Sequence, residues 1–152
     1  MTAVPTHDEL LALARAAAGT AYAPYSEFPV GAAVLGSDGT VHSGCNVENA
    51  AFGLTTCAER GAISAMVRAG TRQIDTVAII GLRAAPCYPC GGCRQALAEF
   101  GCRTVVVEVD GVARAHALVD LLPHGFGPAD LGEPLPRAEP RPGPDEGRPT
   151  RP

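Results

Sequence analysis

The sequence predicts an α/β fold: a three-layer α/β/α domain in which helices cover both faces of a mixed, five-stranded sheet. Segments of helical periodicity alternate with short apolar segments along the chain. Segments 76–80 and 104–109 are almost continuously apolar, which is typical of central strands covered on both faces. Asp-Gly turns follow strand 104–109 and the strand predicted over 30–35; they predict hairpins, whose paired strands are antiparallel.

A capping box marks the start of the first helix. Thr6 is followed three residues later by Glu9, a pattern that satisfies free N–H groups at a helix start. Apolar residues then recur at helical spacing: Leu10, Leu11, Leu13, Ala14 and Ala17. Gly19 is placed to end this helix as its C′ residue.

Turn residues bound the elements that follow. Segments 37–39 and 110–111 predict hairpin turns, while Gly70, Gly101 and Pro123 end helices. In chain order we predict strand 30–35, strand 40–47, helix 57–68, strand 76–80, helix 90–100, strand 104–109, strand 112–115 and helix 117–122.

Composition excludes several classes of protein. A chain of 152 residues with 46% hydrophobic and 18% charged residues suits one globular domain. No apolar run reaches about 18 residues, so no membrane-spanning helix is predicted. Asp8 and Glu9 precede the first apolar stretch, where a secretory signal would be basic, so we expect a cytoplasmic protein with no membrane partner.

The end of the chain differs from the rest. Segment 133–152 holds 7 of the 14 prolines and lacks apolar periodicity, so we predict a disordered, Pro-rich tail after a domain over 1–132. Residues 1–133 contain 8 arginines, no lysine and 13 acidic residues. This balance disfavours nucleic acid as a partner and favours a small neutral or cationic molecule.

Three cysteines stand at two predicted helix starts. Cys57 opens helix 57–68, while Cys90 and Cys93 share one face in the first turn of helix 90–100. The free N–H groups and the positive dipole end of a helix stabilise thiolates at this position. If the two helix starts meet, the three sulfurs form a set that zinc accepts together with a fourth ligand.

The fourth ligand decides whether such a zinc site is structural or catalytic. Cys87 repeats the spacing of Cys90 and Cys93, but Pro86 and Pro89 favour an extended chain there, which argues against Cys87 as a ligand. The histidines lack ligand spacing and are interpreted as surface or loop residues: His7, His42, His116 and His124. Without an export signal, free thiols or a metal site are favoured over disulfides.

Glu59 favours the catalytic form. It follows Cys57 by two residues, where its carboxylate can reach a metal-bound water and move a proton. A solvated glutamate at a helix start is the alternative. Arg60 and Gln95 could donate hydrogen bonds to the sulfurs and offset the charge of three thiolates, and an exposed ion pair is the alternative for Arg60.

Together these residues resemble the cytidine deaminase family of small zinc-dependent nucleoside deaminases. The likeness covers about residues 22–130 and rests on the motifs YSEFPVGAA (25–33), NVENA (46–50), TCAER (56–60), PCGGCRQ (89–95) and LLP (121–123) before FGP (126–128). The Cys-x-Glu and Pro-Cys-x-x-Cys pair is specific to the deaminase superfamily. Phe28, Asn46 and Glu48 narrow the likeness to enzymes of free nucleosides.

The resemblance implies a hydrolase for pyrimidine salvage that converts cytidine and deoxycytidine to uridine and deoxyuridine. It implies Zn²⁺ held by Cys57, Cys90 and Cys93, with Glu59 moving protons while water attacks C4 and ammonia leaves. The implied substrate contacts are Phe28 on the base, the Ala58 N–H on the base carbonyl, and Asn46 and Glu48 on the ribose 3′-hydroxyl.

The resemblance also implies a homotetramer in which Ala50 and Phe126 complete the site of a neighbouring subunit. Phe52 departs from the family pattern, where tyrosine is usual near the 5′-hydroxyl. Structural alternatives stay open: Phe28 as a core aromatic, and Asn46 and Glu48 as hydrogen-bonding loop residues.

Three other functions compete with this hypothesis. A deaminase of a nucleoside antibiotic such as blasticidin S shares the zinc motifs, but Phe28, Asn46 and Glu48 favour the ordinary nucleoside. A nucleic-acid editing deaminase is opposed by the acidic body of the chain. A non-catalytic zinc-binding module is opposed by Glu59 and by the lack of a clear fourth ligand.

Overall fold

The computed structural model describes residues 4–132, and its elements follow the predicted order. They are α1 (His7–Ala18), β1 (Val30–Gly36), β2 (Val41–Cys45), the short 3-10 helix η1 (Phe52–Leu54), α2 (Ala58–Ala69), β3 (Ile74–Gly81), α3 (Gly91–Glu99), β4 (Thr104–Val109), β5 (Val112–Ala117), α4 (Leu118–Leu121) and η2 (Pro128–Leu131). The predicted tail, 133–152, lies outside the described residues, so the division of the chain at 132 stays a prediction.

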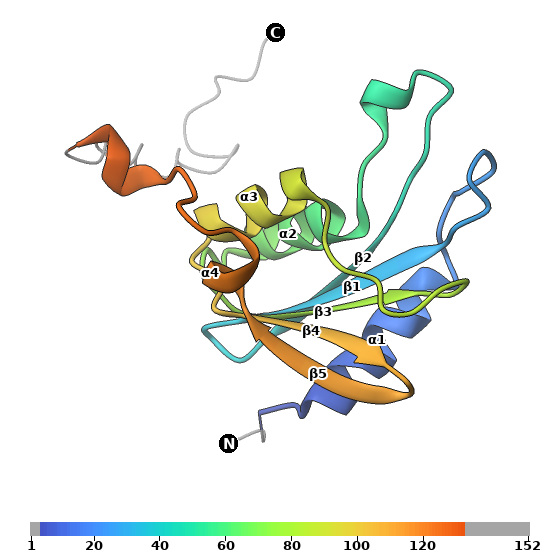
Figure 1. Cartoon of the computed structure of the whole chain (residues 1–152), viewed down its shortest axis with the longest axis horizontal. Helices are drawn as coiled ribbons and strands as arrows, with labels where there is room; N and C mark the ends of the chain where they lie inside the picture. The colour runs from blue at the N-terminus through green and yellow to red at the C-terminus, as the bar shows by residue number, and fades with distance from the viewer. Residues whose placement is uncertain (1–3, 133–152) are drawn as a thin grey trace, which may run out of the picture.

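The strands form one sheet in the order β2-β1-β3-β4-β5 (Figure 1). Strands β3 and β4 are parallel and are joined through α3, whereas every other neighbouring pair is antiparallel. Parallel strands need a crossover connection, and α3 provides it. The predicted mixed, five-stranded sheet is therefore confirmed.

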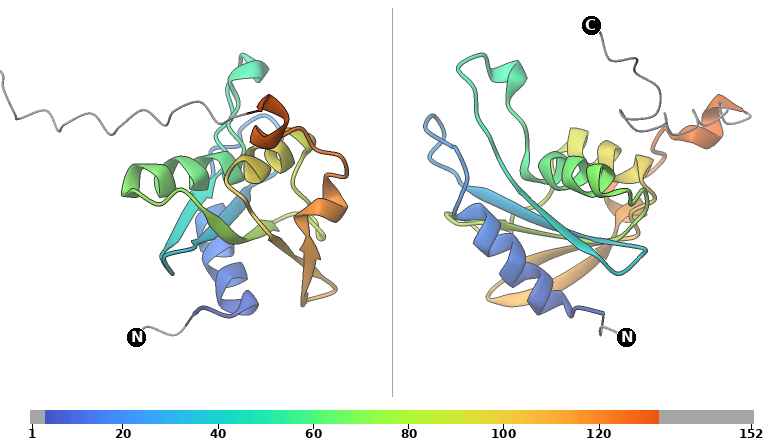
Figure 2. Two further views of the ribbon diagram at one scale, coloured as in Figure 1. Left: turned by 90° about the vertical axis from the view of Figure 1, so that its left-hand side faces the viewer. Right: turned by 180° about the vertical axis from the view of Figure 1, so that it is seen from behind.

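Helices cover both faces of the sheet, with α1 on one side and α2 and α3 on the other (Figure 2). Side chains alternate between the two cores along each central strand: Ala33 and Leu35 of β1 pack toward α1, and Ala32 and Val34 pack toward α2. Burying each valine, leucine or isoleucine in these cores contributes about 1.5–3 kcal/mol. The three-layer fold class is confirmed.

Two glycines let helices approach the sheet closely. A β-carbon on Gly31 would overlap the Ala14 backbone of α1, and one on Gly44 would lie 2.6 Å from the Ala58 carbonyl oxygen of α2. Any larger residue at either position would push its helix away from the sheet. Gly44 thus helps to set how close α2, and the residues at its start, lie to the sheet.

Several predicted boundaries need correction. Helix α1 ends at Ala18, directly before Gly19 as predicted, but Gly19 is the C-cap, with a right-handed φ of −64°, and not the C′ residue. Leu13 is 43% exposed and lies outside the core. Strand β2 ends at Cys45 rather than at residue 47, because Val47 turns away to pair with Tyr22 and Thr56.

The residues predicted at a hairpin turn and at a helix end have the backbone conformations that these positions require. Asp110 and Gly111 have positive φ values of 50° and 74°, as a two-residue hairpin turn requires. Gly70 ends α2 in the left-handed region at φ 104°.

Strand β5 continues to Ala117, beyond the predicted end at residue 115, because its pairing with β4 extends to Thr104. Within residues 4–132, no helix combines the length and apolarity needed to cross a membrane.

Candidate active site

The starts of α2 and α3 lie near each other at one end of the sheet. Both helices pack on the same face, and both begin on the side from which loop 46–56 projects (Figure 1). Segment 82–90 leads from the carboxyl end of β3 to α3, while loop 46–56 leads from β2 to α2. The carboxyl end of a parallel strand is where α/β folds commonly place ligand sites.

Three sulfurs converge at these helix starts. Cys57 and Cys90 are the N-cap residues of α2 and α3, and neither uses its side chain to cap the helix. Their Sγ atoms lie 4.0 Å apart, and those of Cys57, Cys90 and Cys93 all lie within 4.8 Å of one another. A tetrahedral zinc with Zn–S bonds of about 2.3 Å requires sulfurs about 3.8 Å apart. The observed spacing fits zinc.

Without a cation among them, Cys57 and Cys93 are harder to ionise than an ordinary cysteine. Burial raises the pKa of Cys57, and burial together with the negative charges of Glu59 and Cys57 raises that of Cys93. The pKa of Cys90 is lowered, because hydrogen bonds from Cys93 and Cys57 outweigh the opposing effect of burial. Three thiolates beside a carboxylate repel one another, and a divalent cation at their centre removes that repulsion.

Cys87 lies outside this group. Among the described residues, the group of converging ligand atoms consists of Cys57, Cys90 and Cys93. Cys87 is half-buried against the core beneath α2 and α3, and burial with the nearby charge of Glu59 raises its pKa to about 11. This environment suits a neutral, packed thiol.

Glu59 is buried beside the sulfurs, with 4% of its surface exposed. It therefore cannot be the solvated helix-start glutamate that the sequence left open as an alternative. Burial raises its pKa above that of an ordinary glutamate. It lines a pocket of about 170 Å³ together with Val30, Asn46, Thr55, Cys57, Ala58, Cys87, Tyr88 and Cys90.

Asn46 both borders this pocket and organises the loop before β1. Its Nδ2 donates to the carbonyl oxygen of Phe28 at 3.0 Å, and its Oδ1 accepts from the N–H of Val30 at 2.9 Å. The amide thus fixes the chain on either side of Pro29. These contacts are those expected if Asn46 is a hydrogen-bonding loop residue. Asn46 also lines the pocket that contains Glu59.

Glu48 organises the preceding part of the same loop. Its Oε2 accepts from the N–H groups of Tyr25 at 2.8 Å and Ser26 at 3.2 Å. Hydrogen bonding from the Ser26 side chain and from these N–H groups lowers the pKa of Glu48, so it is ionised at neutral pH. It lines a neighbouring pocket of about 400 Å³ with Tyr25, Ser26, Phe52 and Thr55.

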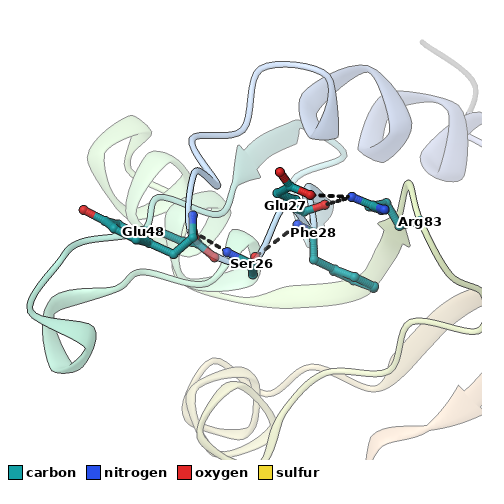
Figure 3. Close-up of polar contacts among 6 residues, drawn as sticks. Ser26, Glu27, Phe28, Glu48 and Arg83 are labelled. Atoms are coloured by element: carbon teal, nitrogen blue, oxygen red, sulfur yellow. Dashed lines mark hydrogen bonds and ion pairs between the residues drawn. The ribbon is translucent and has the colours of Figure 1, made fainter.

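Phe28 is half-buried at the end of this loop, next to the carboxyl end of β3. Figure 3 shows Ser26, Glu27 and Phe28 between Glu48 at one end of the network and Arg83 at the other. The Phe28 N–H donates to Ser26 Oγ at 3.0 Å. Asn46 on the pocket wall, Ser26 and Glu48 thus belong to one connected set of hydrogen bonds with Phe28, which itself does not line the pocket that contains Glu59.

The other predicted residues have different surroundings. Arg60 donates to the carbonyl oxygen of Thr55 at 2.8 Å, and Gln95 donates to that of Phe126 at 2.7 Å. These contacts hold the loops around the site, and the predicted effect of Arg60 and Gln95 on the sulfurs stays a prediction. Ala50 and Phe126 are exposed, and neither borders the pocket that contains Glu59.

Tyr88 and Thr55 also line the pocket, although neither was predicted from the sequence. The Tyr88 hydroxyl lies 3.3 Å from Nε2 of His116 on β5, and the two rings meet edge-on at 5.3 Å. Each missed residue lies within two positions of a ligand cysteine, which is the signal that could have identified them. The position of His116 beside Tyr88 depends on the pairing of β4 with β5, which the local sequence does not reveal.

Comparison with known proteins assigns the chain to a family. Residues 4–109 match the model of the cytidine and deoxycytidylate deaminase zinc-binding region. The chain belongs to this family. The resemblance noted in the sequence is confirmed, and the three-cysteine group fits the Zn²⁺ that the family binds.

Individual relatives match over most of their length. A cytidine deaminase of Sporosarcina psychrophila is 42% identical over 127 residues, which covers 82% of this chain and 93% of that protein. One of Mycobacterium tuberculosis is 45% identical over 117 residues, covering 77% and 86%. The crystal structure of a cytidine deaminase from Burkholderia pseudomallei superimposes with a TM-score of 0.75 at 45% identity, covering 80% of this chain and all of that one.

Proposed function

We propose that this chain is a hydrolase that deaminates cytidine and deoxycytidine, giving uridine or deoxyuridine and ammonia. The observation that carries the proposal is a buried carboxylate, Glu59, beside three converging sulfurs; the cysteines that carry two of them, Cys57 and Cys90, line the same small pocket as Glu59. Family membership and the similar cytidine deaminases support the same reaction.

The metal would be held by Cys57, Cys90 and Cys93. When bound there, Zn²⁺ supplies a Lewis acid that makes a water molecule nucleophilic at neutral pH. Three protein ligands are the set used by catalytic zinc sites, whereas structural sites close with four.

Glu59 would move the protons of the reaction. Its carboxylate takes a proton from the attacking water and delivers it to N3 of the pyrimidine. It then moves the remaining proton of that oxygen to the C4 amine, which leaves as ammonia while the C4 carbonyl forms. A carboxyl group whose pKa is raised by burial is suited to both accept and release a proton near neutral pH. Its position in the first turn of α2 keeps it within the pocket wall.

Residues of the pocket wall and of the adjoining loops would orient the nucleoside. Ala58 is fully buried as the first residue of α2, where its N–H is free to bind the base carbonyl. Phe28 would stack on the base. Asn46 and Glu48 would hold the ribose 3′-hydroxyl with hydrogen-bonding capacity beyond their loop contacts. The ionised Glu48 would repel a 3′-phosphate and thereby disfavour a polynucleotide.

The competing functions are less well supported. The curated relatives that match most of this chain are cytidine deaminases, so the antibiotic deaminase is not favoured. A non-catalytic zinc module offers no reason to bury Glu59 in a pocket wall. A nucleic-acid editing enzyme would place basic side chains around its pocket, but the charged residue that lines it is Glu59.

We further propose a homotetramer with shared sites, located in the cytoplasm and acting in pyrimidine salvage. Phe52, Leu54 and Phe126 are 76%, 70% and 60% exposed, and large exposed apolar side chains of this kind mark protein interfaces. Phe126 is also one of the two positions that the family resemblance assigns to a neighbouring site. Free thiols in a metal site suit a reducing compartment.

The test is turnover by zinc-loaded protein with cytidine, deoxycytidine, blasticidin S and a single-stranded oligonucleotide as separate substrates. We expect ammonia and uridine or deoxyuridine from the two nucleosides, with zinc at one atom per chain. Turnover of blasticidin S or the oligonucleotide without turnover of either nucleoside would reject the proposed function. Light scattering of the same sample tests the tetramer, and a monomer that is fully active would reject shared sites.

A further inference from the structure

The carboxyl end of β3 lies directly against the loop that carries Phe28. We propose that Gly81 and Arg83, at this end of β3, are positioning residues that fix the Phe28 ring and thereby set substrate affinity. This inference rests on the proposed function, because it takes a pyrimidine nucleoside as the ligand that Phe28 contacts.

Loop 22–29 is held on two sides. The hydrogen bonds of Asn46 and Glu48 described above hold the side that faces β2. On the other side, the Leu82 N–H donates to the Pro29 carbonyl oxygen at 3.0 Å. Beyond it, Arg83 reaches back across the loop to Glu27 (Figure 3). Without Arg83, the side of the loop that faces β3 would keep one backbone hydrogen bond next to Phe28.

Arg83 binds both the backbone and the side chain of Glu27. Its Nη1 lies 3.2 Å from the Glu27 carbonyl oxygen and 3.2 Å from Glu27 Oε2. That carbonyl belongs to the peptide unit whose nitrogen is the Phe28 N–H. Since a peptide unit is planar, fixing the oxygen at one end also fixes the direction in which Phe28 leaves the loop.

The backbone of Glu27 needs such support. Its φ is 52°, in the left-handed region, where the β-carbon of an L-residue crowds the backbone. A strained residue relaxes unless its surroundings hold it. The contacts from Arg83 oppose relaxation at the residue that directly precedes Phe28.

Gly81 supports the ring itself. A β-carbon at Gly81 would lie 2.9 Å from Cε1 of Phe28, a distance that real β-carbons essentially never show, and 3.0 Å from both Cζ of Phe28 and the carbonyl oxygen of Ala84. The ring therefore packs directly on the bare backbone of β3, and a side chain at position 81 would move it. Gly81 and Arg83 thus act on the same aromatic side chain from two directions.

The expected loss of affinity differs between the Arg83 and Gly81 variants. The side chains of Arg83 and Glu27 are 59% and 75% exposed, so water screens their attraction. We expect Arg83→Gln to raise the KM for cytidine and the Kd for uridine about two- to five-fold. Gly81→Ala displaces the ring directly, and we expect a rise of about ten-fold.

The experiment compares zinc-loaded variants by steady-state kinetics with cytidine and by calorimetry with the product uridine. Arg15→Gln is the matched control, because it removes an arginine that pairs with Glu108 at 2.7 Å beside α1, on the opposite face of the sheet. We expect Arg83→Gln and Gly81→Ala to raise KM and Kd while kcat stays within two-fold and zinc content is unchanged. Arg83→Lys, which keeps the charge, is expected to recover part of the affinity.

A second arm links the effect to Phe28. In a Phe28→Leu background, the aromatic ring is absent, so Arg83→Gln is expected to cause no further loss of uridine affinity. Fully additive losses would overturn the proposal, as would unchanged KM and Kd in both single variants or an equal loss in Arg15→Gln. If the unaltered protein neither deaminates cytidine nor binds uridine, the proposed function fails instead.

Discussion

Replacing Glu59 by glutamine removes the proposed proton carrier while keeping the shape of the side chain. Glu59 is 4% exposed, and among the residues that line its pocket it is the one carboxylate, so no neighbour is placed to take over its role. General acid–base groups contribute about 10²–10⁴-fold to a rate, and the lack of a substitute places this site near the upper limit. We expect kcat to fall by about 10⁴, equivalent to about 5 kcal/mol of barrier.

The same substitution is expected to leave the metal and the fold in place. Glutamine cannot ionise, so it avoids burying a charge, and the zinc-free variant should unfold at a temperature no lower than the unaltered protein. The assay measures ammonia release from cytidine, zinc per chain and thermal unfolding, with the exposed Glu99→Gln as the charge-matched control. A Glu59→Gln enzyme with full zinc and more than a tenth of the original kcat would refute the proton-carrier role.

Three further predictions concern the metal group, the packing and the response to acid. Cys87→Ala should keep one zinc per chain after dialysis, whereas Cys93→Ala should lose it, and metal analysis showing the reverse would exclude the three-sulfur site. Gly44→Ala should lower the free energy of unfolding in urea by about 1–3 kcal/mol, because its β-carbon would lie 2.6 Å from the Ala58 carbonyl oxygen; Gly53→Ala, whose β-carbon meets nothing within 4 Å, is the control. Hydrogen bonds from Thr71 and Thr40 lower the pKa of Asp38 from 3.8 to about 2, so its contribution to stability is present above pH 3.8 and is lost as the pH falls toward 2. Asp38→Asn should therefore weaken the acid dependence of the unfolding temperature in this window, and identical profiles for both proteins would contradict the assignment.

The features that the sequence predicted correctly are mostly local. The capping box of Thr6 and Glu9, the Asp110-Gly111 turn and the end of α2 at Gly70 each depend on residues close together in the chain. The convergence of Cys57 with Cys90 and Cys93 was also predictable, because helix starts and thiolates suit each other and zinc needs a compact set of sulfurs. Because zinc binds all three sulfurs, the segments that carry Cys57, Cys90 and Cys93 must lie close together in the fold.

The features that the sequence missed depend on pairs far apart in the chain. Arg83 and Glu27 meet because β1 and β3 pair in register, and no local signal identifies that contact. The double role of Asn46, which fixes the loop and borders the pocket, follows from where β2 ends. Leu13 fits the helical pattern of apolar residues, but the sheet covers a narrower face of α1 than that pattern suggests.

The most direct test of the account is X-ray absorption at the zinc edge of the metal-loaded protein. We predict three sulfur ligands at about 2.3 Å and one oxygen ligand at about 2.0–2.2 Å, supplied by water. The same spectrum from Cys87→Ala should be unchanged, since Cys87 is outside the converging group. Four sulfur ligands, or a histidine nitrogen in the fourth position, would identify a closed structural site and contradict the proposed hydrolysis.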